Sequence, residues 1–151
     1  MFHEKIREVR AAASGHERVF VVIHAFTGEL SSSQLLDAIR DLTYHRDYPI
    51  MTINADLAAD AEWDLADDTV FDELYRLAAE GFIHVWLGTP PRSTWNRTLS
   101  EARPVRASGR WLWGLPDLGK NERSRVLEAN ILMLNFLAVG EAVAANGGLF
   151  C

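Results

Sequence analysis

The chain has 151 residues, of which 48% are apolar, and a formal charge of −6. This composition argues against a disordered chain and against broad, unspecific attraction to nucleic acid. The length suits one domain, so we expect residues 1–151 to form a single folded unit. The single cysteine, Cys151, excludes an intramolecular disulfide and a thiolate-rich metal site, and no other metal-ligand set is evident.

The N-terminus, MFHEKIREVR, is charged where a secretory signal would be apolar. No apolar run approaches the length needed to cross a bilayer. We therefore expect a soluble intracellular protein without a membrane span, and an N-terminal helical extension over residues 1–18.

The first half of the chain alternates apolar strands with a helical pattern. The run 19-VFVVIHA-25 predicts a strand buried on both faces. Ser31 to Ser33 then offer N-caps to a helix that extends to about Thr43. After a polar turn, 50-IMTINA-55 predicts the second strand.

The acidic segment 56–68 is expected to be loop, with one short strand near Trp63 to Leu65. Asp67 or Asp68 can cap the next helix, which Gly81 ends.

The second half begins with a further predicted strand, 82-FIHVWL-87. Residues 89–119 are rich in Pro, Gly, Arg and Trp, and a long irregular connection of this kind usually carries function. A final helix is expected over about 122–145, and 149-LFC-151 predicts the start of another strand.

This alternation predicts an α/β fold with helices on both faces of a mainly parallel sheet. In such sheets ligands lie outside the carboxyl ends of the strands. The segments 24-HAFTGE-29, 54-NAD-56 and 88-GTPPRSTW-95 should therefore lie along one edge.

The polar residues at this edge suit a nucleoside ligand. The turn after the first strand has one glycine, Gly28, and no glycine-rich phosphate motif. Asp56 is placed to accept hydrogen bonds from two ribose hydroxyls, and Asp64 from an adenine amino group. This layout suits S-adenosylmethionine.

Simpler interpretations stand beside these assignments. His24 and His84 alternate with apolar neighbours and are interpreted as hydrogen-bonded interior or edge histidines, with catalysis as the alternative. Asp56 is a cofactor contact or an ordinary loop acid. The other acids, Asp64, Asp67 and Asp68, are capping residues or part of a solvated face.

Over roughly residues 19–151 the order of features resembles the Rossmann-like cytosine-5 DNA methyltransferases, especially their divergent relatives in retroelement-derived proteins. The resemblance rests on the following stretches: 24-HAFTG-28, 56-DLAADAEWDLADDTVFDELYRLAAEG-81, 88-GTPPRSTW-95, 113-WGLP-116 and 147-GGLFC-151. It implies a three-layer α/β/α sandwich, truncated after the fifth strand. The implied cofactor site comprises His24, Phe26, Gly28, Asp56, Asp64, Thr89 and Pro90.

The sequence departs from this family at the nucleophile. The family places a cysteine directly after the two prolines, and here that position is Arg92. A guanidinium is protonated near neutral pH and is no nucleophile, so covalent cytosine methylation is unavailable to it. Three interpretations of Arg92 stay open. It marks a catalytic site that has lost its activity, it forms an ion pair with the acidic 56–68 segment, or it binds an anion together with Arg97.

These observations predict a degenerate methyltransferase-like domain that acts as a non-catalytic binding or assembly subunit. The alternative is an active S-adenosylmethionine-dependent methyltransferase acting on an oxygen or nitrogen nucleophile or on nucleic acid. A protein partner would complete the C-terminal sheet edge. The Arg/Trp-rich region 92–125 offers a nucleic-acid surface, in which Trp95, Trp111 and Trp113 either stack on bases or anchor the loop.

Overall fold

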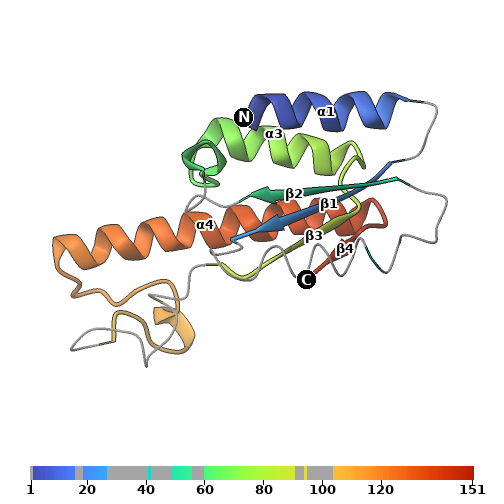
Figure 1. Cartoon of the computed structure of the whole chain (residues 1–151). Coiled ribbons are helices and arrows are strands. Elements are labelled where there is room, and N and C mark those ends of the chain that lie inside the picture. Colours follow the sequence, from blue (N-terminus) through green and yellow to red (C-terminus); the bar gives the residue numbers. More distant parts are fainter. Residues whose placement is uncertain are drawn as a thin grey trace.

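The computed structural model describes residues 2–15, 19–26, 41, 49–55, 60–90, 94 and 104–151. Within them the chain forms helices, short 3-10 turns and strands (Figure 1). Their bounds in chain order are α1 Phe2–Ser14, β1 Phe20–Ala25, β2 Ile50–Ala55, η1 Ala61–Trp63, α3 Asp68–Ala79, β3 Val85–Gly88, η2 Gly109–Trp111, α4 Lys120–Ala145 and β4 Leu149–Phe150.

The described strands form one parallel sheet in the order β2-β1-β3-β4. Phe20 at the start of β1 pairs with Ile50 of β2, and Val22 pairs with Val85 of β3 on the other side. In chain order β1 is followed by β2, which pairs with one side of β1, and then by β3, which pairs with the other side. The direction in which strands are added therefore reverses between β1 and β3, and this is the topological switch point of the sheet. Open α/β sheets bind ligands outside the carboxyl ends of the strands at this point.

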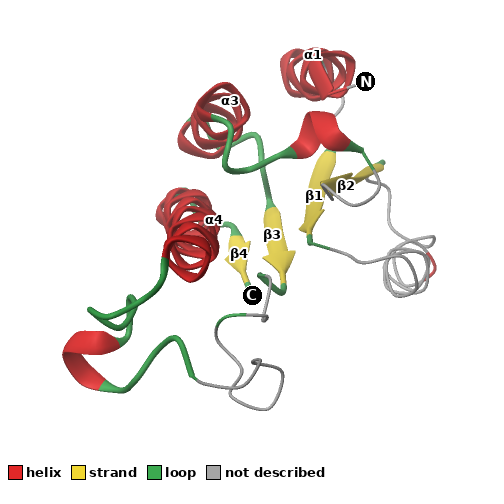
Figure 2. Cartoon of the chain, turned by 90° about the vertical axis from the view of Figure 1, so that its left-hand side faces the viewer, coloured by secondary structure: helices red, strands yellow, loops and turns green. Residues whose placement is uncertain are grey.

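The helices α1, α3 and α4 lie side by side on one face of the sheet (Figure 2). Side chains alternate between the two faces of a strand, and Val21, Ile23 and Ala25 of β1 belong to the core beneath these helices. By the same alternation, Val22 and His24 point to the opposite face.

The expected α/β class with a mainly parallel sheet is confirmed. The helix predicted to end near residue 43, which would form the second helical layer, lies outside the described residues except for residue 41.

The prediction of a strand near Trp63 to Leu65 is wrong, because Trp63 belongs to the 3-10 turn η1 and neither Asp64 nor Leu65 lies in a strand. Asp60 caps the turn, since its Oδ1 accepts a hydrogen bond from the N–H of Glu62 at 3.0 Å. Trp63 and Leu65 are buried as the sequence pattern suggests, but they enter the core from a turn. The described sheet therefore has four strands.

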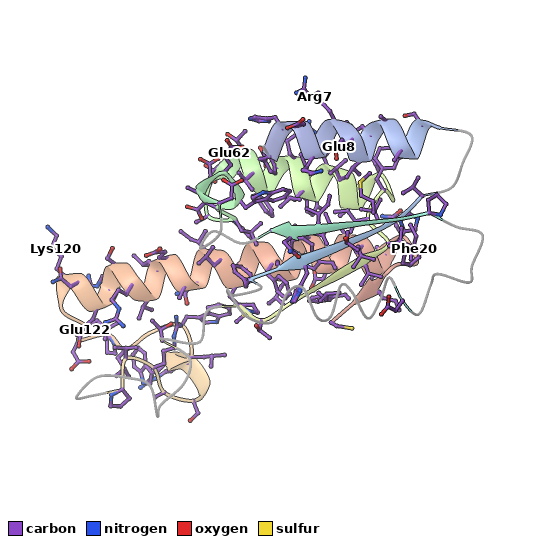
Figure 3. All side chains as sticks on the ribbon, in the orientation of Figure 1. Arg7, Glu8, Phe20, Glu62, Lys120 and Glu122 are labelled. Carbon is purple, nitrogen blue, oxygen red and sulfur yellow. The ribbon has the colours of Figure 1, made fainter. Side chains whose placement is uncertain are left out.

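The N-terminal helix contributes to the core. Phe2, Ile6 and Val9 recur at helical spacing and are all buried, while Arg7 points away from the body of the protein (Figure 3). On the α3 side, Arg10 forms ion pairs with Glu73 at 3.2 Å and Glu80 at 3.0 Å. Pairs as exposed as these typically contribute less than about 1 kcal/mol, so the buried apolar face dominates the docking of α1.

Helix α3 begins and ends where the sequence predicts. Asp67 is its N-cap and accepts a hydrogen bond from the N–H of Thr69 at 2.8 Å. At the other end Gly81 has φ +76, and the N–H of Phe82 donates to the carbonyl of Leu77 at 2.9 Å. This Schellman ending uses Phe82 in the turn, so β3 starts at Val85 and not at the predicted residue 82.

Helix α4 covers β3 and β4 through a group of aromatic rings. Phe136 is buried, and its ring lies 5.4 Å from that of Trp86 in β3 and 5.5 Å from that of Phe150 in β4. The indole Nε1 of Trp86 donates to the carbonyl oxygen of Phe136 at 3.0 Å. The helix starts at Lys120, two residues before the predicted start, because Gly119 serves as its N-cap.

Candidate functional site

The carboxyl ends of β1 and β3 bring together four of the predicted cofactor residues. His24 lies near the end of β1, opposite Leu87 of β3, and Phe26 directly follows β1. Thr89 and Pro90 directly follow β3. These positions lie at the switch point, as the predicted connectivity requires.

Phe26 has a backbone conformation that is rare for a bulky residue. Its φ is +56, in the left-handed region, where an L-residue other than glycine is destabilised by roughly 1–2 kcal/mol. Its N–H donates to the carbonyl of Ala55 at 3.0 Å, and its ring lies 5.7 Å from that of Phe136. The chain therefore turns sharply at the end of β1 while the Phe26 ring packs against the core, and such strain is typical of functional loops.

Gly88 allows β1, β3 and α4 to approach one another closely. A Cβ at this position would lie 2.3 Å from the carbonyl oxygen of Ala25 and 3.1 Å from Cε2 of Phe136. Any residue larger than glycine at this position would push β1 and β3 apart at the switch point. Glycine is thus required at the base of the candidate site.

The side chains at this edge differ in accessibility. His24 is buried, Pro90 is half-buried and Thr89 is exposed. His24 also lies beside Asn54 of β2 in the sheet register, and Asn54 is exposed. The exposed polar side chains at this edge therefore come from β2 and from the segment after β3, while His24 of β1 is buried beside them.

Three residues central to the prediction, Gly28, Asp56 and Arg92, lie outside the described residues. The ribose contact of Asp56 and the replacement of the family's cysteine by Arg92 stay predictions.

Asp64 has a local structural role. Its Oδ1 accepts a hydrogen bond from the N–H of Ala66 at 2.9 Å, which holds the turn between η1 and α3. Its predicted contact with adenine is untested.

Asp64 also lines an open hollow of about 560 Å³ formed by α1, η1 and the start of α3. The lining includes Phe2, Glu62 and Asp67, and the volume falls in the usual range of small-molecule sites. Its carboxylates disfavour phosphate and suit donors such as amino groups and hydroxyls.

Arg106 is a key residue of the loop that sequence reasoning missed. It is buried, and its guanidinium donates to the hydroxyl of Thr94 at 2.9 Å, the carbonyl of Leu112 at 3.0 Å and Oδ1 of Asn130 at 2.7 Å. Burial lowers the pKa of Arg106 from its ordinary value, but an arginine stays protonated at neutral pH.

These bonds link Thr94 through the Arg106 guanidinium to Asn130 in the first half of α4. No local pattern separates Arg106 from the other arginines of the region, because Asn130 lies 24 residues away.

The Arg/Trp-rich region therefore contributes less basic surface than its composition suggests, since Arg106 faces inward. Arg110 lies over the ring of Trp111, 4.7 Å from its centroid. The carbonyl of Trp113 accepts a hydrogen bond from Nδ2 of Asn130 at 3.0 Å. The Trp113 side chain itself is 45% exposed. The hydrogen bond from Asn130 ties the Trp113 backbone to α4, and the two interpretations of Trp111 and Trp113, loop anchors or base-stacking groups, stay predictions.

His84 has a structural role between Gly81 and β3. Its Nδ1 accepts a hydrogen bond from the N–H of Val21 at 3.1 Å, and its ring lies 4.8 Å from that of Phe20. Burial lowers the pKa of His84, which favours the neutral form that can accept this bond. The interior interpretation of His84 thus has a physical basis.

Within the part of the chain that the structure describes, α4 is long and apolar enough to cross a membrane by length and composition alone, and 39% of its most apolar window is buried. The core helix of a soluble protein passes the same test. The same described part contains no group of three His, Cys, Asp or Glu side chains placed to hold a metal ion.

The described fold and edge define an α/β protein with an all-parallel sheet and a switch point between β1 and β3. This architecture is consistent with a Rossmann-like fold. No protein-family model, curated protein or solved structure matches the chain.

Proposed function

We propose that the chain is a methyltransferase-like domain that binds a nucleoside ligand at the carboxyl edge of β1 and β3 and serves as a non-catalytic binding or assembly module. The observation that carries this proposal is the convergence of His24, Phe26, Thr89 and Pro90 at the switch point. The ligand class follows from the absence of a phosphate-binding glycine motif and from Asp56 after β2.

The non-catalytic part of the proposal rests on Arg92. Addition to cytosine C6 needs a thiolate, and Arg92 follows the two prolines where the family has its cysteine. Thr94, two residues on, is buried and accepts hydrogen bonds from Arg106, which makes it a poor substitute nucleophile.

The assembly part of the proposal rests on the last strand of the described sheet. β4 pairs with β3 alone among the described strands, and Leu149 is 63% exposed. A protein partner that adds a strand there would cover this edge.

Methyl transfer from labelled S-adenosylmethionine tests the non-catalytic claim. The purified chain, incubated with DNA or RNA, should transfer no label above a blank without protein. Transfer that Asp56→Ala abolishes and Asp68→Ala retains would instead establish the active enzyme, in which an oxygen or nitrogen of the substrate is the nucleophile. Asp68 is a suitable control because it is an exposed acid in the first turn of α3.

A further inference from the structure

Helix α4 is apolar on the face that packs on the sheet and on the face that points outward. Phe136, Val139 and Val143 are buried in the core. On the outward side Leu127 is 54% exposed, Ile131 45%, Leu134 50% and Leu137 38%. Exposed apolar side chains that gather on one face of a helix mark an interaction surface, so this outward face calls for a further contact.

Three of these residues, together with the half-buried Ala138, have the spacing of a helix-pairing seam, and Leu137 lies beside it. Leu127, Ile131, Leu134 and Ala138 follow one another at intervals of four, three and four, which is the 3.5-residue period of paired helices. We call these four residues the outer stripe. Continuing the period in both directions reaches Ser124 and Glu141.

The two ends of the outer stripe carry opposite charges. Near the start of α4 lies a hollow of about 390 Å³, lined by Leu118, Lys120, Arg123, Ser124 and Leu127. Figure 3 shows Lys120 projecting from the end of the helix that is farthest from the sheet. At the other end of the stripe, Glu141 is exposed.

We propose that the outer stripe joins two copies of this chain, with their α4 helices antiparallel about a two-fold axis. In this arrangement Ile131 of one copy faces Leu134 of the other, and Leu127 faces Ala138, so that a large side chain meets a small one. The next layer places Glu141 of each copy over Ser124 of the other, at the basic hollow that Lys120 and Arg123 line.

Charge complementarity favours a second copy of this chain as the partner, and it favours the antiparallel orientation of the two α4 helices. A two-fold axis makes the acid-to-base contact twice, and antiparallel helices also oppose their dipoles favourably. A parallel pair would set Glu141 against Glu141 and Arg123 against Arg123, which is unfavourable.

Sedimentation velocity over roughly 1–200 µM tests the dimer, a range that covers micromolar association. The unaltered chain should shift from monomer to dimer. Leu134→Glu should weaken association by about 100-fold, since it places a charge in the centre of an apolar contact. Tyr75→Glu is the matched control, because Tyr75 is a 44% exposed aromatic residue on α3 and should leave association unchanged.

Exchanging the charges at positions 141 and 123 gives a second test. A variant that had merely lost its fold would not regain the dimer when the second substitution is added. Glu141→Arg should weaken the dimer by about 10-fold, and adding Arg123→Glu to the same chain should restore it. A monomer at every concentration, equal disruption by Tyr75→Glu, or failure of the exchange to restore the dimer would overturn the proposal. A monomer that floats with phospholipid vesicles would also overturn it and assign the outer stripe to a membrane surface.

Discussion

Gly88→Ala tests whether the close approach of β1 and β3 depends on glycine. The added Cβ would lie 2.3 Å from the carbonyl oxygen of Ala25 and 3.0 Å from its carbonyl carbon. These are backbone atoms of a paired strand and cannot rotate away. Overpacking commonly costs about 1–3 kcal/mol, and we expect the free energy of unfolding to fall by about 3 kcal/mol because the clash is with backbone.

Gly147→Ala separates this steric effect from backbone conformation. Gly147 has φ +81, and a Cβ added there would meet no atom of the described residues within 4 Å. Alanine at this position should therefore lower the free energy of unfolding by about 1 kcal/mol through its conformation alone. Urea unfolding followed by tryptophan fluorescence measures both variants. A loss for Gly88→Ala equal to or smaller than that for Gly147→Ala would refute the close-approach argument.

Further substitutions probe the caps, the loop and a histidine. Asp67→Ala should lower the free energy of unfolding by about 1 kcal/mol in thermal melts, because the N–H of Thr69 loses its acceptor. Arg106→Met should cost about 3 kcal/mol in urea unfolding, because it leaves buried acceptors unsatisfied. Burial lowers the folded-state pKa of His84, so its contribution is present above the unfolded pKa of about 6.5 and is lost as pH falls through the lower folded value. His84→Gln should flatten this acid limb of a stability-versus-pH curve, and an unchanged acid limb would contradict the role of the bond from Val21.

The parts of the fold that could be predicted have strong local signals. The β-branched run of β1, the cap at Asp67 and the stop at Gly81 each depend on neighbouring residues in the chain. Their physical causes act over a few residues, so the sequence displays them. The parallel α/β arrangement follows from the alternation of such elements.

The errors occur where tertiary packing or a turn decides the conformation. Trp63 and Leu65 have the alternating pattern of a strand, yet Asp60 and Asp64 hold the segment in turns through their side chains. Apolar periodicity alone does not distinguish a buried turn from a short buried strand.

The candidate site was only partly predictable for a similar reason. Chain connectivity places Phe26 and Thr89 at one edge, so the order of elements predicts their proximity. The role of Arg106 depends on partners in distant segments, namely Thr94 and Asn130, and no short motif expresses it.

Calorimetric titration with S-adenosylhomocysteine tests the central claim most directly, because it asks whether the carboxyl edge of β1 and β3 holds a nucleoside ligand. We predict saturable heat with the unaltered chain, its loss in Asp56→Ala and its retention in Asp68→Ala. Absence of heat at millimolar ligand, or undiminished binding by Asp56→Ala, would contradict the account.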